Sequence, residues 1–187
     1  MNTTKTKKDV HIPTWTLNNF IRRRFGKPTR YNSEVGQGQR VADLGCGPGF
    51  YTLPLAERVG PAGKVYAVDS DEKAIRVIEH KAAKKKYHNI ETHITSAAKL
   101  DFIQDETVDF VLADGLLCCV APQDHAETVS EIMRILKPDG KAYLVTGRSS
   151  MTYMQDDEWE EILKQFNVIR RNHVPYNGDR WAWVTKR

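Results

Sequence analysis

The chain has 187 residues, which suits one domain of ordinary size with its own core, so we expect a single domain over residues 1–187. Hydrophobic residues make up 40% and charged residues 28%, a balance that excludes an intrinsically disordered chain, and no stretch approaches the ~18 apolar residues of a membrane span. The formal net charge of +4 is modest and favours a solvated surface over an acidic or nucleic-acid partner, without deciding the function.

Residues 1–36 predict a helical N-terminal cap. The first ten residues are polar and basic with no apolar segment behind them, so we expect no signal peptide. Thr14 suits a helix N-cap and Gly26 ends that helix. Its apolar residues recur at helical spacing and are Leu17, Phe20, Ile21 and Phe25. Pro28 opens a second short helix, which ends in a loop at residues 36–38.

Residues 40–187 alternate between strand-like and helix-like patterns, which predicts an α/β core with a parallel sheet. Strands are expected at residues 40–44, 64–68, 90–95, 108–113 and 141–146. Two helices lie between the first three strands, with apolar faces formed by Leu53, Ala56 and Val59 and by Ala74, Ile75, Ile78 and Ala82. Two more are expected at residues 124–136, before a turn at residues 137–140, and at residues 156–166.

The last part of the chain predicts an antiparallel hairpin. Strands are expected at residues 168–174 and 181–186, and Asn177-Gly178 between them is a strong hairpin signal. A hairpin joined to a parallel sheet requires one antiparallel strand, which we expect at the edge of the sheet. The predicted fold is therefore α/β, with a mostly parallel seven-stranded sheet, an antiparallel C-terminal hairpin and the helical cap.

A glycine-rich turn follows the first strand directly and precedes a helix. Gly45, Gly47 and Gly49 allow a sharp turn and a close approach of the backbone to a ligand. Asp69 ends the second strand, twenty residues after Gly49, where dinucleotide-type folds place an acid on a ribose diol. Asp43 lies just before the glycines, where its carboxylate would repel a pyrophosphate but suits a ligand with an ammonium group and a sulfonium.

At these residues the sequence resembles the class I S-adenosylmethionine (SAM)-dependent methyltransferases. Residues 41–49 are similar to the family's first motif, residues 65–69 to its ribose-binding loop, and residues 136–141 to its loop before the fifth strand. The resemblance covers residues 40–146, and the C-terminal hairpin agrees with it, whereas NAD-binding domains normally lack one. It implies a Rossmann-like fold that binds SAM. The nearest branch contains ubiquinone/menaquinone-biosynthesis and arsenite methyltransferases.

The resemblance also implies roles for individual residues at the cofactor. Asp43 orients the ammonium group, directly or through water, and Asp69 takes the ribose hydroxyls. Ser70 lies against the adenine. The methionine end is lined by Gly45, Cys46, Gly47 and Gly49. We interpret Cys46 as a small turn residue rather than a nucleophile, because the loop offers it no base.

The sequence departs from the family after the third and fourth strands. Ser96, followed by Ala97, stands where the family has an acid that bonds the adenine amino group; a hydroxyl still accepts such a bond, but more weakly. Cys118 and Cys119 stand where the branch often has two histidines. Buried packing is the favoured interpretation of this pair, and a thiol acting as base, soft-ion ligand or redox sensor is the alternative. Asp114 is equally consistent with a backbone cap and with a contact to cofactor or substrate.

The cysteine pattern and the absence of motifs found in other methyltransferases limit the possible functions. Three cysteines, two of them adjacent, form a poor disulfide framework, which indicates a cytoplasmic location, and no arsenite-binding set of three dispersed cysteines is apparent. We expect no bound metal. The run after the fourth strand lacks the Asn/Asp-Pro-Pro-Tyr of amino methyltransferases acting on adenine or glutamine and the Pro-Cys of cytosine enzymes, which disfavours nucleic acid.

We therefore expect methyl transfer to a small, apolar or soft-nucleophile acceptor, and no catalytic residue can be named. The alternatives are an inactive SAM-binding or adaptor protein, a methyltransferase acting on protein or RNA, and a nicotinamide oxidoreductase. An apolar lid over the acceptor and plain core packing are both open for five side chains: Trp15, Tyr31, Met151, Tyr153 and Met154.

Overall fold

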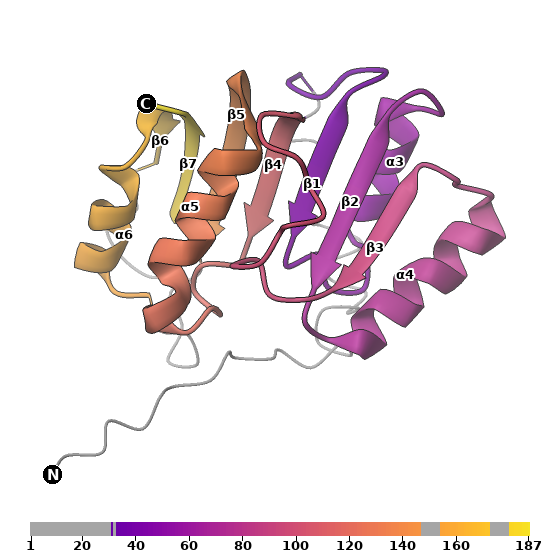
Figure 1. Cartoon of the computed structure of the whole chain (residues 1–187), viewed down its shortest axis with the longest axis horizontal. Coiled ribbons are helices and arrows are strands. Elements are labelled where there is room, and N and C mark those ends of the chain that lie inside the picture. The colour runs from indigo at the N-terminus through magenta and orange to yellow at the C-terminus, as the bar shows by residue number, and fades with distance from the viewer. Residues whose placement is uncertain (1–30, 32, 147–153, 173–179) are drawn as a thin grey trace, which may run out of the picture.

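The computed structural model describes residues 31, 33–146, 154–172 and 180–187, in which strands and helices alternate as expected (Figure 1). The strands are β1 (Arg40–Leu44), β2 (Lys64–Asp69), β3 (Ile90–Ile94), β4 (Val108–Asp114), β5 (Leu136–Thr146), β6 (Asn167–Arg171) and β7 (Arg180–Thr185). The helices are α3 (Thr52–Val59), α4 (Glu72–Lys85), α5 (His125–Ile135) and α6 (Asp156–Leu163), with a 3-10 turn, η1 (Pro122–Asp124), before α5.

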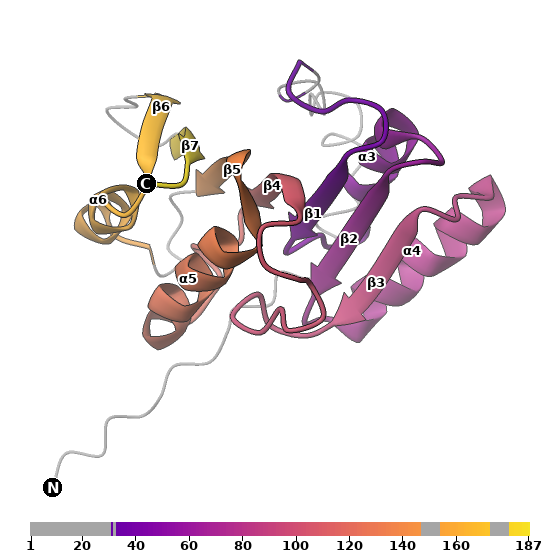
Figure 2. The same ribbon diagram turned by 45° about the horizontal axis from the view of Figure 1, so that its top comes forward.

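The strands form one seven-stranded sheet in the order β3-β2-β1-β4-β5-β7-β6, which Figure 2 shows from edge to edge. The first five strands pair in parallel, whereas β7 is antiparallel to both of its neighbours. The mostly parallel sheet with an antiparallel hairpin is confirmed. The expected place of the antiparallel strand is wrong: β7 inserts between β5 and β6, and β6 forms the edge. Because β7 lies between two strands, its backbone N–H and C=O groups form hydrogen bonds on both sides. Its Ala182 and Val184 are fully buried.

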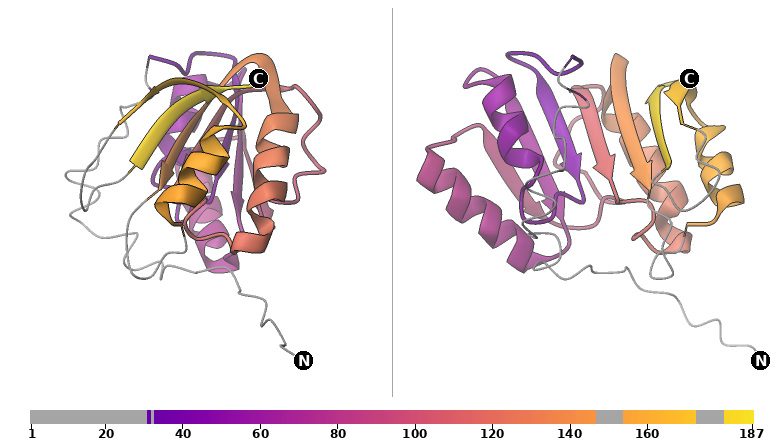
Figure 3. Two further views of the ribbon diagram at one scale, coloured as in Figure 1. Left: turned by 90° about the vertical axis from the view of Figure 1, so that its left-hand side faces the viewer. Right: turned by 180° about the vertical axis from the view of Figure 1, so that it is seen from behind.

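In the described part of the chain, two helices cover each face of the sheet. Because side chains alternate along a strand, successive residues of β1 enter different core clusters. Val41 packs with Leu55 of α3, while Ala42 packs in a cluster that contains Ile132 of α5 and Trp159 of α6. In α4, the buried residues are the four predicted ones, Ala74, Ile75, Ile78 and Ala82. Seen from behind, α3 and α4 lie in front of the strands (Figure 3).

Two local expectations are corrected. In α3 the inward side chains include Thr52 and Leu55, whereas Leu53 is only partly buried, because the helix begins with Thr52 turned toward the sheet. The turn expected at residues 137–140 belongs to β5: Leu136 pairs with Val108 and Lys141 with Phe110, so the segment between them bulges out of register. The Pro and Gly there accommodate a bulge rather than separate the strand from α5.

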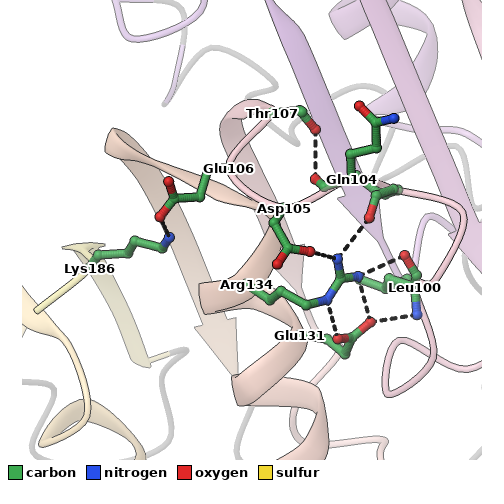
Figure 4. Close-up of polar contacts among 9 residues, drawn as sticks. Leu100, Gln104, Asp105, Glu106, Thr107, Glu131, Arg134 and Lys186 are labelled. Atoms are coloured by element: carbon green, nitrogen blue, oxygen red, sulfur yellow. Dashed lines mark hydrogen bonds and ion pairs between the residues drawn. The ribbon is translucent and has the colours of Figure 1, made fainter.

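A polar clamp from α5 holds the long connection between β3 and β4 (Figure 4). The Arg134 guanidinium donates to the Leu100 and Ile103 carbonyl oxygens, both at 2.8 Å, and to the Asp105 carboxylate at 2.5 Å. It also donates to Glu131 at 2.6 Å, and Glu131 in turn accepts from the Leu100 N–H at 2.7 Å. The clamp replaces the hydrogen bonds that this irregular segment cannot make within itself.

The helical cap expected at residues 1–36 lies almost wholly outside the described residues, as does the Asn177-Gly178 turn. The loop expected at residues 36–38 is present as a turn. Among the helices of the described ranges, none has the length and apolarity needed to cross a membrane.

Candidate functional site

Three aspartates lie at the carboxyl ends of neighbouring parallel strands and share one face of the sheet. Asp43 of β1 pairs with Ala67 of β2 and Leu112 of β4. Asp69 and Asp114 come two residues after these partners, and a two-residue step returns a side chain to the same face. The register therefore places all three carboxylates on the face covered by α3 and α4, at the edge where ligands bind in such sheets.

The glycine turn and the ribose acid, predicted as separate parts of one site, are in direct contact. The N–H of Gly47 donates to Asp69 Oδ2 at 2.8 Å, and the N–H of Asp71 donates to Asp69 Oδ1 at 2.9 Å. The N–H groups of Gly45 and Cys46 both donate to the Val68 carbonyl oxygen. Each carboxylate oxygen of Asp69 keeps a further lone pair for a ligand hydroxyl.

Gly47 and Gly49 adopt backbone conformations that side chains disfavour. Their φ angles are +50° and +82°, in the left-handed region. A Cβ on Gly49 would lie 2.8 Å from Cγ1 of Ile78 in α4, which is closer than packed carbon atoms allow. The turn can therefore hold this shape against α4 only with glycine at these positions.

Asp43 is almost completely buried, and its partner was not predicted. Oγ1 of Thr52, the first residue of α3, donates to Asp43 Oδ2 at 2.7 Å. This bond compensates for burial of the carboxylate and ties the start of α3 to the end of β1. In the sequence, Thr52 stands three positions after Gly49, where a hydroxyl residue suits the start of a helix. That position does not reveal the hydrogen bond to Asp43.

Tyr31 lies on the same face, in the cluster that contains Leu55 and Phe110. Its ring is 5.7 Å from that of Tyr51 and 5.9 Å from that of Phe110, measured between centroids. Met154, the other described candidate for an apolar lid, packs in the cluster on the opposite face. The two side chains therefore pack different halves of the core. Trp15, Met151 and Tyr153 lie outside the described residues.

Cys46 is buried in a small cluster with Ala67 and Ile78. Burial, reinforced by the negative charges of Asp43 and Asp69, raises the pKa of the Cys46 thiol well above its ordinary value. A thiol held in its protonated form is a poor nucleophile. This supports the interpretation of Cys46 as a turn residue.

The segment expected at the adenine follows β3 and lies next to Asp69. The N–H of Thr95 donates to the Asp69 carbonyl oxygen at 3.1 Å, which brings Ser96 and Ala97 to this end of β2. Ser96 Oγ accepts from the Ala98 N–H at 3.2 Å, so the hydroxyl shapes its own turn and keeps its proton for another acceptor. Ser70 is exposed beside Asp69, and Ala97 is buried.

The turn after β4 is apolar and is fastened from α5. His125 Nε2 lies 2.9 Å from the Leu117 carbonyl oxygen and 3.1 Å from that of Val120, so this nitrogen carries the hydrogen. Cys118 is buried among apolar side chains, with its Sγ 3.4 Å from the Gly115 carbonyl oxygen, and Cys119 packs against the same cluster. This geometry favours packing for both thiols. His125 was not identified from the sequence, because only the fold brings it back onto the turn.

The residues present fit SAM. Three acids gather at one sheet edge, and a cofactor with an ammonium and a sulfonium group gains from their charge, whereas a pyrophosphate would be repelled. The glycine turn has no side chain to obstruct a ligand at Gly47. SAM supplies an electrophilic methyl group when it binds; the chain supplies a shaped site with fixed acceptors.

Comparison with known proteins identifies a matching family and several relatives. A family model described as a methyltransferase domain matches residues 41–140. A demethylmenaquinone methyltransferase of Geobacillus stearothermophilus is 32% identical over 117 residues, which are 63% of this chain and 49% of that protein. Another, of Listeria monocytogenes, is 30% identical over 85% of this chain and 63% of that protein. The chain thus spans about half the length of the first of these relatives.

A solved structure shows the same likeness over nearly the whole fold. The crystal structure of a SAM-dependent methyltransferase from Aquifex aeolicus superposes with a TM-score of 0.74 at 25% sequence identity. The superposition covers 92% of this chain and 96% of that one.

Proposed function

We propose that this chain, which belongs to the SAM-dependent methyltransferases, transfers the methyl group of SAM to a small apolar acceptor of the demethylmenaquinone type. The proposed acceptor class rests on one observation. The chain is 30–32% identical to proteins named demethylmenaquinone methyltransferases, over up to 85% of its length.

The apolar turn after β4 supports an apolar acceptor. Leu116 comes two residues after Asp114 and lies against the glycine turn, since a Cβ on Gly45 would be 3.2 Å from Leu116 Cδ1. A water-poor wall of this kind suits an aromatic ring better than a charged peptide or a phosphate backbone.

A soft metalloid acceptor is less well supported. Cys46 and Cys118 belong to different core clusters, Cys46 with residues of α4 and Cys118 with residues of α5. Because these two thiols pack in separate clusters, the structure gives no support to their binding one ion together. Of the two acceptor classes expected from the sequence, the apolar one is therefore preferred.

The chemistry asks little of the side chains. The acceptor atom attacks the methyl carbon, the carbon–sulfur bond breaks, its electrons go to sulfur, and S-adenosylhomocysteine leaves. The protein accelerates this step by holding the acceptor in line with the sulfonium and by excluding water. A base is required only if the acceptor carries a proton at working pH.

The test is methyl transfer from radiolabelled SAM to a detergent-solubilised, reduced naphthoquinone that lacks the ring methyl group. Product is identified by mass spectrometry as a gain of CH₂, with total RNA and total protein as parallel acceptors. Label in the naphthoquinol alone supports the proposal. Label in RNA or protein alone, or SAM binding with no transfer to any acceptor, contradicts it.

Asp69→Ala serves as the matched control, because loss of the ribose acid should lower transfer by the chain roughly ten- to a hundredfold at subsaturating SAM while leaving any contaminating activity unchanged. The cytoplasmic location stays a prediction, because it depends only on the pattern of the cysteines.

A further inference from the structure

Tyr31 has a buried hydroxyl with no hydrogen-bond partner among the described residues. The side chain is 2% exposed, and its ring is fixed between Tyr51 and Phe110. An unpaired buried hydroxyl destabilises the folded state, because it loses its hydrogen bonds to water and gains none. A phenylalanine would fill the same space without that cost, so the hydroxyl calls for an explanation.

The surroundings of the hydroxyl connect it to the cofactor edge. Burial, followed by the charges of Asp43, Tyr51 and Asp114, raises the pKa of Tyr31 far above its ordinary value. The phenol therefore stays protonated and is a hydrogen-bond donor at every working pH. Phe110 lies on β4 four residues before Asp114, and Tyr51 immediately precedes Thr52, which binds Asp43. Tyr31 thus packs against β4, which carries Asp114, and against the residue before Thr52, which holds Asp43.

We propose that the Tyr31 hydroxyl binds the amino-acid end of the cofactor by donating a hydrogen bond to its α-carboxylate. That end is zwitterionic, so it needs acceptors for the ammonium group and donors for the carboxylate. Asp43 and Asp114 can serve only the ammonium group and would repel the carboxylate. A neutral donor within reach of the charges of both acids compensates for that repulsion and orients the methionine chain.

The inference concerns SAM binding and does not depend on the identity of the methyl acceptor. It is tested by comparing two ligands in the absence of acceptor. S-adenosylhomocysteine keeps the amino-acid end, whereas 5′-methylthioadenosine keeps the adenosine and sulfur but lacks it. Dissociation constants of both are measured for the wild type and Tyr31→Phe by competition with radiolabelled SAM.

The expected result is selective. Tyr31→Phe should weaken the binding of S-adenosylhomocysteine roughly ten- to a hundredfold, which is the range for a hydrogen bond to a charged group. The dissociation constant of 5′-methylthioadenosine should change by no more than about twofold. The thermal midpoint of the ligand-free variant should be equal to or above that of the wild type, because the substitution removes an unpaired hydroxyl.

Tyr87→Phe is the matched control, since its hydroxyl lies near Glu57 at 3.4 Å, away from the three acids, and neither ligand should respond. Unchanged affinity for S-adenosylhomocysteine in Tyr31→Phe would overturn the proposal. Equal weakening of both ligands would overturn it too, because the effect would then come from distortion of the site. A lowered thermal midpoint would show that the hydroxyl has a structural partner instead.

Discussion

Asp69 is the central residue of the candidate cofactor site, because its carboxylate accepts a hydrogen bond from the Gly47 N–H and so fixes the glycine turn. Asp69→Ala removes that bond together with the acceptor that we propose for the ribose hydroxyls. We expect the binding free energy of SAM or S-adenosylhomocysteine to weaken by about 1.5–3 kcal/mol, as for hydrogen bonds to a charged group, measured by calorimetry.

Asp71→Ala is the control for this substitution. Asp71 caps α4 by accepting from the Lys73 N–H at 2.9 Å. Loss of the cap should lower stability by about 1 kcal/mol while leaving cofactor affinity unchanged. If Asp69→Ala bound SAM as tightly as wild type, the ribose assignment would be wrong.

Cys118 and Cys119 allow a second test at this scale. Because both thiols pack against the apolar cluster under β4 and β5, alanine at both positions should leave methyl transfer within a few-fold of wild type. Serine at both positions keeps a polar atom but should cost stability, since Cys118 is 3% exposed. A loss on the order of 10²-fold or more in both variants, at unchanged SAM affinity, would instead identify a positioned thiol base.

At the scale of elements, the contact of α5 with the β3–β4 connection is made by Arg134, which pairs with Asp105 and Glu131, and by Glu131, which accepts from the Leu100 N–H. The hydrogen bond from Arg134, partly opposed by burial, lowers the pKa of Glu131 below its ordinary 4.5. A carboxylate with a lowered pKa in the folded state contributes stability above its unfolded pKa, and this contribution is lost as pH falls through the folded pKa.

We therefore expect Glu131→Gln to destabilise the protein most at neutral pH, with the difference from wild type shrinking as pH falls below about 4.5. Urea unfolding at a series of pH values measures it. Glu161→Gln is the control: Glu161 pairs with Lys164 on the exposed surface of α6, and such pairs contribute little. A difference for Glu131→Gln that stays constant down to pH 3 would mean that the charge of Glu131 is not what stabilises the clamp.

At the scale of the whole molecule, the site joins β1, β2 and β4 with α3, so ligand binding should stabilise the fold as a unit. S-adenosylhomocysteine at 100 times its dissociation constant should add about 2.7 kcal/mol to the free energy of unfolding. For a chain of this size the thermal midpoint should rise by roughly 5–10 °C, measured by calorimetry. NAD at the same concentration should produce no rise, and a rise with NAD alone would contradict SAM as cofactor.

Features that depend on neighbouring residues were predictable from the sequence. The buried face of α4, the end of β2 at Asp69 and the glycine turn before α3 follow from local periodicity and turn chemistry, and the structure has each of them. The alternation of these elements was also enough to predict a mostly parallel sheet, because parallel strands need helical crossovers.

Features that depend on distant partners were decided only by the tertiary structure. The placement of β7 inside the sheet, the bulge after Leu136, the bond from Thr52 to Asp43 and the unpaired hydroxyl of Tyr31 all lack a signal within their own segments. In each case the free energy of folding depends on whether a polar group is hydrogen-bonded, or an apolar group buried, against a segment that is remote in the chain. Local propensity carries no information about that partner, so the same residues are compatible with several arrangements until the whole sheet has formed.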